Sequence, residues 1–570
     1  MRIERNTLLG LLAIAFILRA YAAVNMPQAN ADEMLYSLLS IGTLTSPWQR
    51  LSTLFHGPIY FYLTDLSYLL FGVNFFAARF FAVLFSAFSV LLVYLIAKEL
   101  FDAKIGVIAG AIFAFSAAQI YFGSLGLLDI PATALSMLSI LFLFRWHKRG
   151  ERRELLFSLG IYAVAVTVKI SQLFLSPVFL LILGHGILQK KYMNPRDYVF
   201  AALIFVMLIL PVPIYNYLLF SDKGLADFHI SRAFSLNSAL EYFRGQNIAG
   251  IDDAYFNISY FNTVGPHLFT LFFEYLSIPL LLFFVIGSIE IAKKRSITDI
   301  ALLAWFLVPI FSYLFYVFHA YYLAVLMPPI AIIASVGLQA VGSYFSRFTN
   351  TKVLVSAFLF ILIFWEVAML LPHISGKSTI YQLQEDIQRL PDNATVVMDD
   401  TIWTGTTLWM GATSGKKVMS LSEFSQGQQE FVSQGLKPGI LDIYAVSCVP
   451  GNCGWSNVEP GAQDNSERLK TDLHNYGTKI AEIYGAEGPE YEVYKMRVTA
   501  SPFGRISMRF VGYVIGHPER SIDVYDAKWP MGVIMNVVAH LSLWVDILVA
   551  LSLPLVVLLL FWKEKIAIEL

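Results

Sequence analysis

Twelve long apolar segments most constrain how this chain can fold. The hydrocarbon core of a bilayer is about 30 Å thick, so a helix needs about 20 predominantly apolar residues to cross it. Segments of this kind lie at residues 7–24, 76–97, 105–122, 127–146, 155–170, 172–188, 198–219, 268–291, 297–317, 321–342, 353–371 and 533–562. The sequence therefore predicts a polytopic α-helical membrane protein with about 12 transmembrane helices.

The composition agrees with this class and excludes two others. Of the 570 residues, 57% are hydrophobic and 14% are charged, whereas about 25% of residues are charged in an average soluble domain. A soluble fold is therefore excluded. The net charge is −1, so the chain has no basic excess for binding a nucleic acid. Residues 7–24 could pass for a signal peptide, but no clean cleavage site follows them, and we interpret them as the first transmembrane helix.

The distribution of basic residues predicts the orientation. Lys and Arg collect in cytoplasmic loops, and here they occupy every second loop, at residues 2–5, 98–104, 145–153, 190–196, 293–295, 347–352 and 563–565. We therefore expect a multi-pass protein of the cell membrane with both termini in the cytoplasm. The long segments 25–75, 220–267 and 372–532 are expected to face outward.

Three parts are expected along the chain. They are a transmembrane domain at 1–371 with outer loops 25–75 and 220–267, a small α/β extracytoplasmic domain at 372–532, and a final transmembrane helix with a cytoplasmic tail at 533–570. The α/β assignment rests on β-like runs at 395–398, 440–446 and 491–498 and a helical stretch at 466–475.

The expected outer domain contains both cysteines of the chain. Cys448 and Cys453 flank a Pro-Gly-Asn turn, and an outer location permits oxidation, so we prefer a local disulfide to free thiols. A zinc site would need more ligands than this loop offers. Asn257 and Asn393 begin glycosylation sequons on the expected outer side, although such tripeptides also occur by chance.

Several charged residues interrupt the apolar segments. At a rise of 1.5 Å per residue, Asp129, Lys169 and Glu366 fall in the outer third of their spans. Asp546 lies at a similar depth, and Arg79 stands at the outer end of its span. Charges in such places are costly and usually functional, so their common depth predicts a polar cavity open to the outer leaflet. Taken singly, each is explained as well by snorkelling or by an ion pair between helices, such as Lys169 with Glu366 or Asp546.

The first outer segment contains the sharpest local feature. Asp32 and Glu33 begin the sequence Asp-Glu-Met-Leu-Tyr, and the sequence His-Gly-Pro-Ile-Tyr follows at 56–60. Adjacent carboxylates at a membrane surface suit a general base or a metal ligand. An exposed Asp-Glu pair is also common as a solvated helix cap, so the residues alone leave both interpretations open.

Taken in order, these motifs resemble the membrane glycosyltransferases of the GT-C superfamily. The resemblance rests on Asp-Glu-x-x-Tyr at 32–36, His-Gly-Pro-x-Tyr at 56–60, Ala-Arg-Phe at 78–80, Leu-Asp-Ile-Pro at 128–131, Thr-Val-Lys at 167–169 and His-Ala-Tyr-Tyr at 319–322. In pattern the chain is most similar to the protein O-mannosyltransferases and the aminoarabinose transferases of lipid A. The resemblance covers residues 1 to 345 and extends to the outer domain only in placement.

The resemblance implies a hexosyl- or pentosyltransferase that moves a sugar from a polyprenyl- or dolichyl-phosphate carrier to a lipid, glycan or protein acceptor at the outer membrane face. It implies that Asp32 is the base, with Glu33 beside it, and that Asp129 completes the acidic side of the site. The residues that it assigns to the donor phosphate and carrier are Arg79, Lys169, His56, His319 and Tyr322. The three acidic residues could also hold a divalent metal, although the family often works without one, and no other cofactor is implied.

The sequence departs from the family in two places and leaves two rival classes. Gly57 stands where the family more often has Pro, and no Trp-Trp-Asp-Tyr-Gly element of the oligosaccharyltransferases occurs, which disfavours en bloc glycan transfer to asparagine. A transporter would have paired half-repeats with broken helices and charges near the midplane, which we do not expect here. A non-catalytic receptor with an outer ligand-binding domain would not need Asp32 or Lys169.

Overall fold

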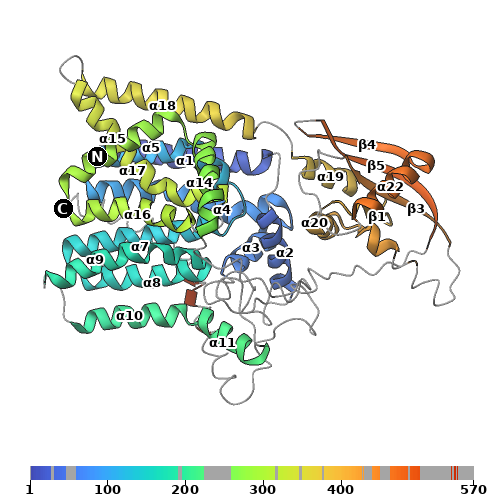
Figure 1. Ribbon diagram of the computed structural model, residues 1–570, viewed down its shortest axis with the longest axis horizontal. Coiled ribbons are helices and arrows are strands. Elements are labelled where there is room, and N and C mark those ends of the chain that lie inside the picture. Colours follow the sequence, from blue (N-terminus) through green and yellow to red (C-terminus); the bar gives the residue numbers. More distant parts are fainter. Residues whose placement is uncertain are drawn as a thin grey trace.

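The computed structural model consists of a bundle of helices with a five-stranded sheet at one end (Figure 1). The structure describes residues 2–26, 31–45, 59–189, 195–223, 258–314, 319–345, 350–374, 378–402, 404–425, 428, 439–449, 462–485, 488–500, 541, 545, 546, 548 and 549. Most of the predicted last span at 533–562 lies outside these residues.

The bundle contains helices that are long and apolar enough to cross a membrane. Among the described residues there are seven, or up to eight if the bent pair α14 (Ile258–Tyr275) and α15 (Ile278–Lys294) forms one span. The others are α1 (Arg2–Asn25), α4 (Phe75–Leu100), α7 (Asp129–Arg149), α9 (Ser176–Leu188) with the 3-10 helix η1 (Ile170–Leu175), α16 (Ile297–Leu314), α17 (Leu323–Tyr344) with η3 (Ala320–Tyr322), and α18 (Thr351–Ile374). The prediction of a polytopic α-helical membrane protein is confirmed.

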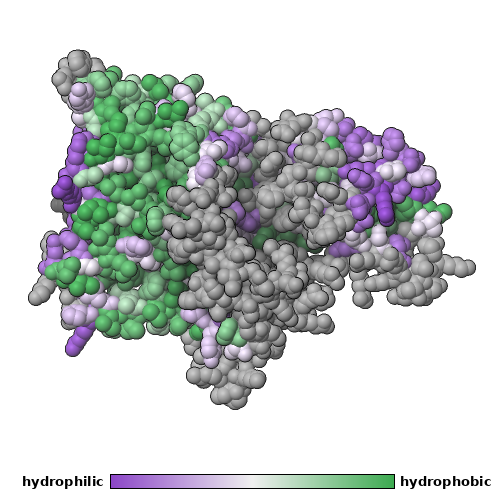
Figure 2. Space-filling view, viewed as in Figure 1, coloured by the Kyte–Doolittle hydropathy of each residue, from purple (hydrophilic) through white to green (hydrophobic). Residues whose placement is uncertain are grey.

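The outer and inner helices differ in what they contact. Hydrophobic side chains cover the bundle, whereas hydrophilic side chains gather over the sheet (Figure 2). Apolar residues such as Leu180 of α9 and Phe360 of α18 are exposed, as side chains that face lipid must be. By contrast, α4, α7 and α17 are almost entirely buried. Polar residues on these inner helices therefore need partners inside the protein.

One predicted span is broken in the middle. The segment 105–122 is divided at Ser116 into α5 (Ala103–Phe115) and α6 (Ala117–Phe122). The backbone of Ser116 leaves the helical conformation, with φ −59° and ψ 127°. In addition, the chain bends by 111° between α14 and α15. The expectation that the chain has no broken helices is therefore wrong.

Two other predicted spans are short. The segment 155–170 is the 17-residue α8 (Arg152–Val168). The segment 198–219 is divided into α10 (Pro195–Ile209) and α11 (Pro211–Lys223). Proline lacks a backbone N–H and is tolerated at the first position of a helix, which explains why α11 begins at Pro211.

Two short helices lie between the bundle and the sheet (Figure 1). They are α2 (Ala31–Thr45) and α3 (Ile59–Phe71), both within the segment expected as the first outer loop. Asp32 and Glu33 stand in the first turn of α2. Negative side chains are favoured there by the partial positive charge of a helix N-terminus.

The remaining elements form a small α/β layer, as predicted. The strands are β1 (Thr395–Met398), β2 (Lys417–Ser420), β3 (Gly439–Cys448), β4 (Thr478–Gly485) and β5 (Gly488–Ala500), in the order β2-β1-β3-β5-β4. Strand β1 is parallel to β2 and β3, and β5 is antiparallel to β3 and β4. The helices are α19 (Thr379–Gln388), α20 (Thr404–Ser414) and α22 (Ala462–Tyr476). The predicted runs fall within β1, β3, β5 and α22, whereas β2 and β4 were not foreseen.

The α/β layer, called the sheet layer below, packs on α4 and on α2, the helix that carries the Asp-Glu pair. Met34 of α2 and Phe75 of α4 share one hydrophobic core with residues of α19 and α20. The ring of Phe75 lies 4.6 Å from that of Tyr381 and 4.5 Å from that of Trp409, measured between centroids. Because Met34 follows Asp32 and Glu33 directly, this packing fixes the turn of α2 on which both carboxylates stand.

Candidate active site

Asp32 and Glu33 contact different parts of the molecule. Successive side chains on an α-helix point about 100° apart, because 3.6 residues complete one turn. Glu33 therefore faces α4, whereas Asp32 faces Tyr321, which donates a hydrogen bond of 2.6 Å to Asp32 Oδ2. The pair is not a solvated cap, since Glu33 is fully buried and Asp32 is half-buried.

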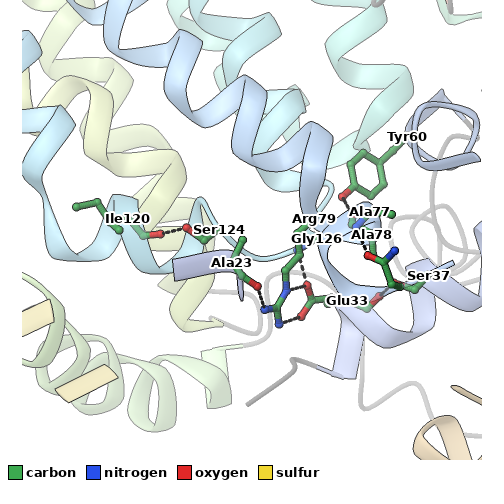
Figure 3. A network of polar contacts seen from close by, with 11 residues as sticks. Ala23, Glu33, Ser37, Tyr60, Ala77, Ala78, Arg79, Ile120, Ser124 and Gly126 are labelled. Carbon is green, nitrogen blue, oxygen red and sulfur yellow. Dashed lines mark hydrogen bonds and ion pairs between the residues drawn. The ribbon is translucent and has the colours of Figure 1, made fainter. Parts of the chain in front are cut away.

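Glu33 forms a bidentate ion pair with Arg79 (Figure 3). Arg79 Nε lies 2.5 Å from Glu33 Oε1, and Nη2 lies 2.8 Å from Oε2. Arg79 Nη1 also donates to the Ala23 carbonyl oxygen at 2.6 Å, and the Gly126 N–H donates to Glu33 Oε1 at 2.8 Å. The pair thus joins α1, α2, α4 and the segment before α7 in one network.

This network leaves Arg79 little room for a substrate. Both members of the pair are buried, with 1% of the Arg79 side chain and 0% of the Glu33 side chain exposed. All three guanidinium nitrogens donate to protein oxygens. A direct contact of Arg79 with the carrier phosphate, as the sequence suggested, would require this network to open. The contacts favour a role in holding Glu33 and α2 in place.

Lys169 and Asp129 form a second buried ion pair. Lys169 Nζ lies 2.6 Å from Asp129 Oδ2, and the side chains are 2% and 0% exposed. Lys169 follows the end of α8 in an extended conformation, and Asp129 begins α7. The alternative in which Lys169 pairs with Glu366 or Asp546 is therefore wrong.

Two tyrosines connect Lys169 with Asp32. Lys169 Nζ lies 5.2 Å from the ring centroid of Tyr321 and 5.1 Å from that of Tyr322, which allows cation–π attraction. Tyr321 is the residue that donates to Asp32. Asp129 and Asp32 are also close enough to interact electrostatically. The second ion pair and the candidate base therefore belong to one cluster.

The late aromatic motif lies at the edge of this cluster. The exposed ring of His319 stacks on Tyr321 with centroids 5.1 Å apart, and the buried ring of Tyr322 stacks on Tyr313 at 4.5 Å. The sequence singled out His319 and Tyr322 but missed Tyr321, which makes the contact with Asp32. Tyr321 lies between His319 and Tyr322 in the sequence, and this position could have identified it as a candidate.

Glu366 has a different environment from that predicted by its depth. Its Oε2 accepts a hydrogen bond from the Ala117 N–H at 2.7 Å, and its Oε1 accepts one from the Ser277 N–H at 3.3 Å. Asp546 is buried as well, and neither of its carboxylate oxygens has a hydrogen-bond partner among the described residues. Glu366 and Asp546 therefore do not join Asp129 and Lys169 in one cavity, although all four were expected at a similar depth.

Arg19 is a buried charge that the sequence interpretation overlooked. It stands in α1 with 0% of its surface exposed and donates to Ser86 Oγ at 2.6 Å. A charged residue within an apolar span is itself a signal of function or of a specific structural role, so the sequence contained the information needed to find it.

The carboxylates do not form a metal site in this arrangement. Across the described ranges, no group of three or more His, Cys, Asp or Glu side chains is placed to hold a metal ion. Glu33 and Asp129 are each bonded to a cation instead. A divalent ion held by Asp32, Glu33 and Asp129 would have to replace Arg79 and Lys169 as the partners of Glu33 and Asp129.

Several other predicted residues can be placed only in part. His56, Cys453 and Asn257 lie outside the described residues. Cys448, at the end of β3, is disulfide-bonded. Asn393 is exposed in the turn before β1.

Part of this chain is similar to a known protein family. Residues 55–215 match the family described as dolichyl-phosphate-mannose-protein mannosyltransferase. Four of the candidate residues, His56, Arg79, Asp129 and Lys169, lie in that range. No curated protein matches the chain in sequence.

Solved structures show a related fold. ArnT from Cupriavidus metallidurans, bound to undecaprenyl phosphate, is 13% identical with a TM-score of 0.53, covering 85% of this chain and 97% of that one. Its apo state is 12% identical with the same coverage and TM-score. The Archaeoglobus fulgidus oligosaccharyltransferase in complex with Zn and sulfate is 16% identical over 90% of this chain and 77% of that one, with a TM-score of 0.47. The family match and the shared fold confirm the resemblance to the GT-C membrane glycosyltransferases.

Proposed function

We propose that this chain, a multi-pass membrane protein with the fold of the GT-C glycosyltransferases, transfers a sugar from a polyprenyl- or dolichyl-phosphate carrier to an acceptor at the outer membrane face. The observation that carries the proposal is the cluster around Asp32. It combines a half-buried carboxylate with a lysine that lies between Asp129 and two tyrosine rings. The cluster lies at the boundary between the bundle and the sheet layer, where a membrane-bound donor and an acceptor outside the membrane can meet.

Asp32 acts as the general base in this proposal. A hydroxyl of the acceptor is a poor nucleophile until a carboxylate takes its proton during attack on the anomeric carbon of the donor sugar. The hydrogen bond from Tyr321 orients one oxygen of Asp32. The same carboxylate takes the proton of the acceptor hydroxyl as the new glycosidic bond forms.

Lys169 stabilises the leaving phosphate. When the glycosidic bond breaks, negative charge grows on the carrier phosphate, and a cation fixed beside it stabilises the transition state more than the ground state. Lys169 is held at one contact by Asp129 and otherwise faces aromatic rings. His319 and Tyr322 border the same place and complete the contacts to the carrier or sugar.

Arg79 and Glu33 position the base rather than touch the substrate. Their bidentate pair fixes the first turn of α2, which also carries Asp32. This assignment changes the role that the resemblance implied for Arg79. It keeps Glu33 beside the base without giving it a step in proton transfer.

The orientation is proposed from the two ends of α4. This helix begins at Phe75 against the sheet layer and has 26 residues, so its other end lies about 39 Å away. There Glu99 pairs with Lys148 and Arg149 of the basic loop. Because basic loops are cytoplasmic, the sheet layer should face outward. A cysteine introduced at the exposed Glu467 of α22 should react with an impermeant maleimide in intact cells, and reaction only after lysis would overturn this orientation.

The activity can be tested directly. Purified protein in proteoliposomes is given radiolabelled polyprenyl-phosphate sugars and a membrane lipid extract, and transfer of label from the carrier is followed. The proposal predicts transfer by the wild type that is lost in Asp32→Asn. Labelled sugar that crosses the vesicle membrane unchanged would indicate a transporter. Tight binding of a sugar ligand without transfer would indicate a receptor.

A further inference from the structure

The break between α5 and α6 lies inside the buried part of the bundle. Phe113, Ala114 and Ala117, which surround it, are all buried. A helix end leaves carbonyl oxygens or N–H groups without partners in the helix, and in a membrane protein no lipid group can satisfy them. Each end of this break therefore needs a polar partner from elsewhere in the chain.

Arg19 satisfies the end of α5. Its Nη1 donates to the Ala114 carbonyl oxygen at 3.1 Å, and its Nη2 donates to the Phe113 carbonyl oxygen at 3.2 Å. No carboxylate bonds to Arg19 among the described residues. The C-terminal end of a helix carries a partial negative charge, which suits a cation.

Glu366 satisfies the start of α6. Its Oε2 accepts from the N–H of Ala117, the first residue of that helix, at 2.7 Å. In the part of the chain that the structure describes, no Lys or Arg pairs with Glu366. A helix N-terminus carries a partial positive charge, which suits a carboxylate. The two buried charges thus compensate the two opposite ends of one broken helix.

The segment that follows this break carries part of the candidate site. From Ala117 the chain passes through α6 to Gly126, whose N–H donates to Glu33, and then to Asp129 at the start of α7. Gly126 sits tightly, since a Cβ there would lie 3.0 Å from the Ala78 carbonyl oxygen and 3.2 Å from Glu33 Oε1. A shift at the break would therefore be transmitted to Glu33 and Asp129.

We propose that Arg19 and Glu366 are positioning residues that clamp the break at Ser116 and thereby hold residues 117–129 in the geometry that sugar transfer needs. The expected effect on turnover rests on the proposed function, whereas the existence of the clamp does not. The clamp also explains why the helix is broken at Ser116, with no need for a transported ligand that binds at the break. The two half-helix ends at Ser116 are occupied by the protein's own charges, whereas a transporter offers such ends to its substrate.

The first test measures the clamp without any substrate. Amide hydrogen exchange is followed by mass spectrometry in wild type, Glu366→Gln and Arg19→Met. Glu366→Gln nearly preserves shape but weakens the bond to Ala117, so exchange in peptides covering 116–128 should rise roughly tenfold or more, as expected for loss of a bond to a charged group. The control is Glu290→Gln, the same change at a half-exposed residue of α15 that pairs with Lys293. It should leave this segment unchanged.

The second test separates positioning from general support. Turnover of a polyprenyl-phosphate sugar should fall about tenfold in Glu366→Gln, because small displacements of reacting groups cost orders of magnitude in rate. The dissociation constant for undecaprenyl phosphate should change less than about twofold, because Lys169 is untouched. Arg19→Lys, which keeps the cation, should recover part of the loss seen in Arg19→Met. Because both residues act on one break, Arg19→Met combined with Glu366→Gln should be less harmful than the two single effects added together.

Three outcomes would overturn the clamp. They are unchanged exchange at 116–128 in both folded variants, an equal rise of exchange across α4, α7 and α17, and strict additivity in the double variant. If Arg19→Met does not fold, Arg19→Lys and Glu366→Gln decide the matter. If the wild type transfers no sugar, the proposed function fails, and the exchange data alone decide whether the clamp exists.

Discussion

The buried ion pairs Glu33–Arg79 and Asp129–Lys169 each join a carboxylate to a basic side chain, but they differ in how many hydrogen bonds the carboxylate receives. In each, an acidic residue from the first turn of one helix meets a basic residue of another part of the bundle. The carboxylate of Glu33 receives hydrogen bonds from Arg79 Nε, Arg79 Nη2 and the Gly126 N–H, which use both of its oxygens. The carboxylate of Asp129 is held by Lys169 through Oδ2, while the buried Oδ1 has no hydrogen-bond partner among the described residues.

This difference indicates which pair can take part in a reaction cycle. A fully bonded pair would lose several contacts if a phosphate displaced one partner, and burial makes each loss costly. The pair of Lys169 and Asp129 would exchange one contact for another, since a carrier phosphate can replace Asp129 Oδ2 at the ammonium group. We therefore interpret Glu33–Arg79 as scaffold and Lys169–Asp129 as the pair that responds to the donor.

The largest effect is expected from breaking the scaffold pair. Arg79→Met leaves the buried carboxylate of Glu33 without its cation, and removal of one partner from a buried pair costs about 3 to 5 kcal/mol of stability. The thermal unfolding of the purified protein measures this. Arg389→Met, which removes an exposed arginine paired with Glu385 and Asp386, should cost less than about 1 kcal/mol. Normal unfolding of Arg79→Met with weakened donor binding would return Arg79 to the phosphate site.

The next effect separates the two adjacent carboxylates. Asp32→Asn removes the proton acceptor and should lower turnover about 100-fold or more, while an amide oxygen can still accept from Tyr321 and keep the fold. Glu33→Gln should instead lower stability together with turnover. The matched control is Asp386→Asn, the same change at a half-buried carboxylate of α19 that pairs with the exposed Arg389. Near-normal transfer by a well-folded Asp32→Asn protein would remove Asp32 from the role of base.

A smaller effect is expected at the responsive pair. Lys169→Met should weaken donor binding about 10-fold to 100-fold, as expected for loss of a charge-assisted contact of about 1.5 to 3 kcal/mol. The substitution also leaves Asp129 unpaired, which lowers stability. Adding Asp129→Asn should therefore restore the melting temperature without restoring donor affinity. Recovery of both in the double variant would show that Lys169 serves only to neutralise Asp129.

The smallest effect is expected for an ion pair near the solvent, that of Asp442 with Arg497 and Lys495. Hydrogen bonds from Arg497 and Lys495 lower the pKa of Asp442 to about 2. A carboxyl whose pKa is lower in the folded state stabilises the fold above its ordinary value of 3.8, and this contribution disappears as the pH falls toward 2. The melting temperature of wild type and Asp442→Asn should therefore differ slightly at pH 6 and converge near pH 2. A difference as large as that of Arg79→Met would contradict the contrast between buried and exposed pairs.

Much of this site could be predicted from residue types and their places along the chain. Asp32, Glu33, Arg79, Asp129 and Lys169 are unusual because a charge next to or within an apolar span is costly. Their partners could not be predicted. Arg79 lies 46 residues from Glu33, and Lys169 lies 40 residues from Asp129, so the path of several helices determines which charges meet.

Depth along a helix proved a poor guide to partners for a physical reason. It gives the height of a residue in the membrane but not the direction in which the side chain points. Glu366 shares the depth of Lys169 yet points to the N–H groups of Ala117 and Ser277. Arg19 points to the carbonyl oxygens at the end of α5.

By itself, the sequence determined the membrane class of the protein, most helix positions and the α/β character of its last layer. These depend on the length of apolar runs and on local periodicity, which can be read along a single segment. Only the tertiary structure decided that Glu33 is locked to Arg79, that Asp129 is held at one oxygen, and that the helix breaks at Ser116. Inside a membrane every buried charge and every free helix end must find its partner within the protein, and those partners come from segments far apart in the sequence.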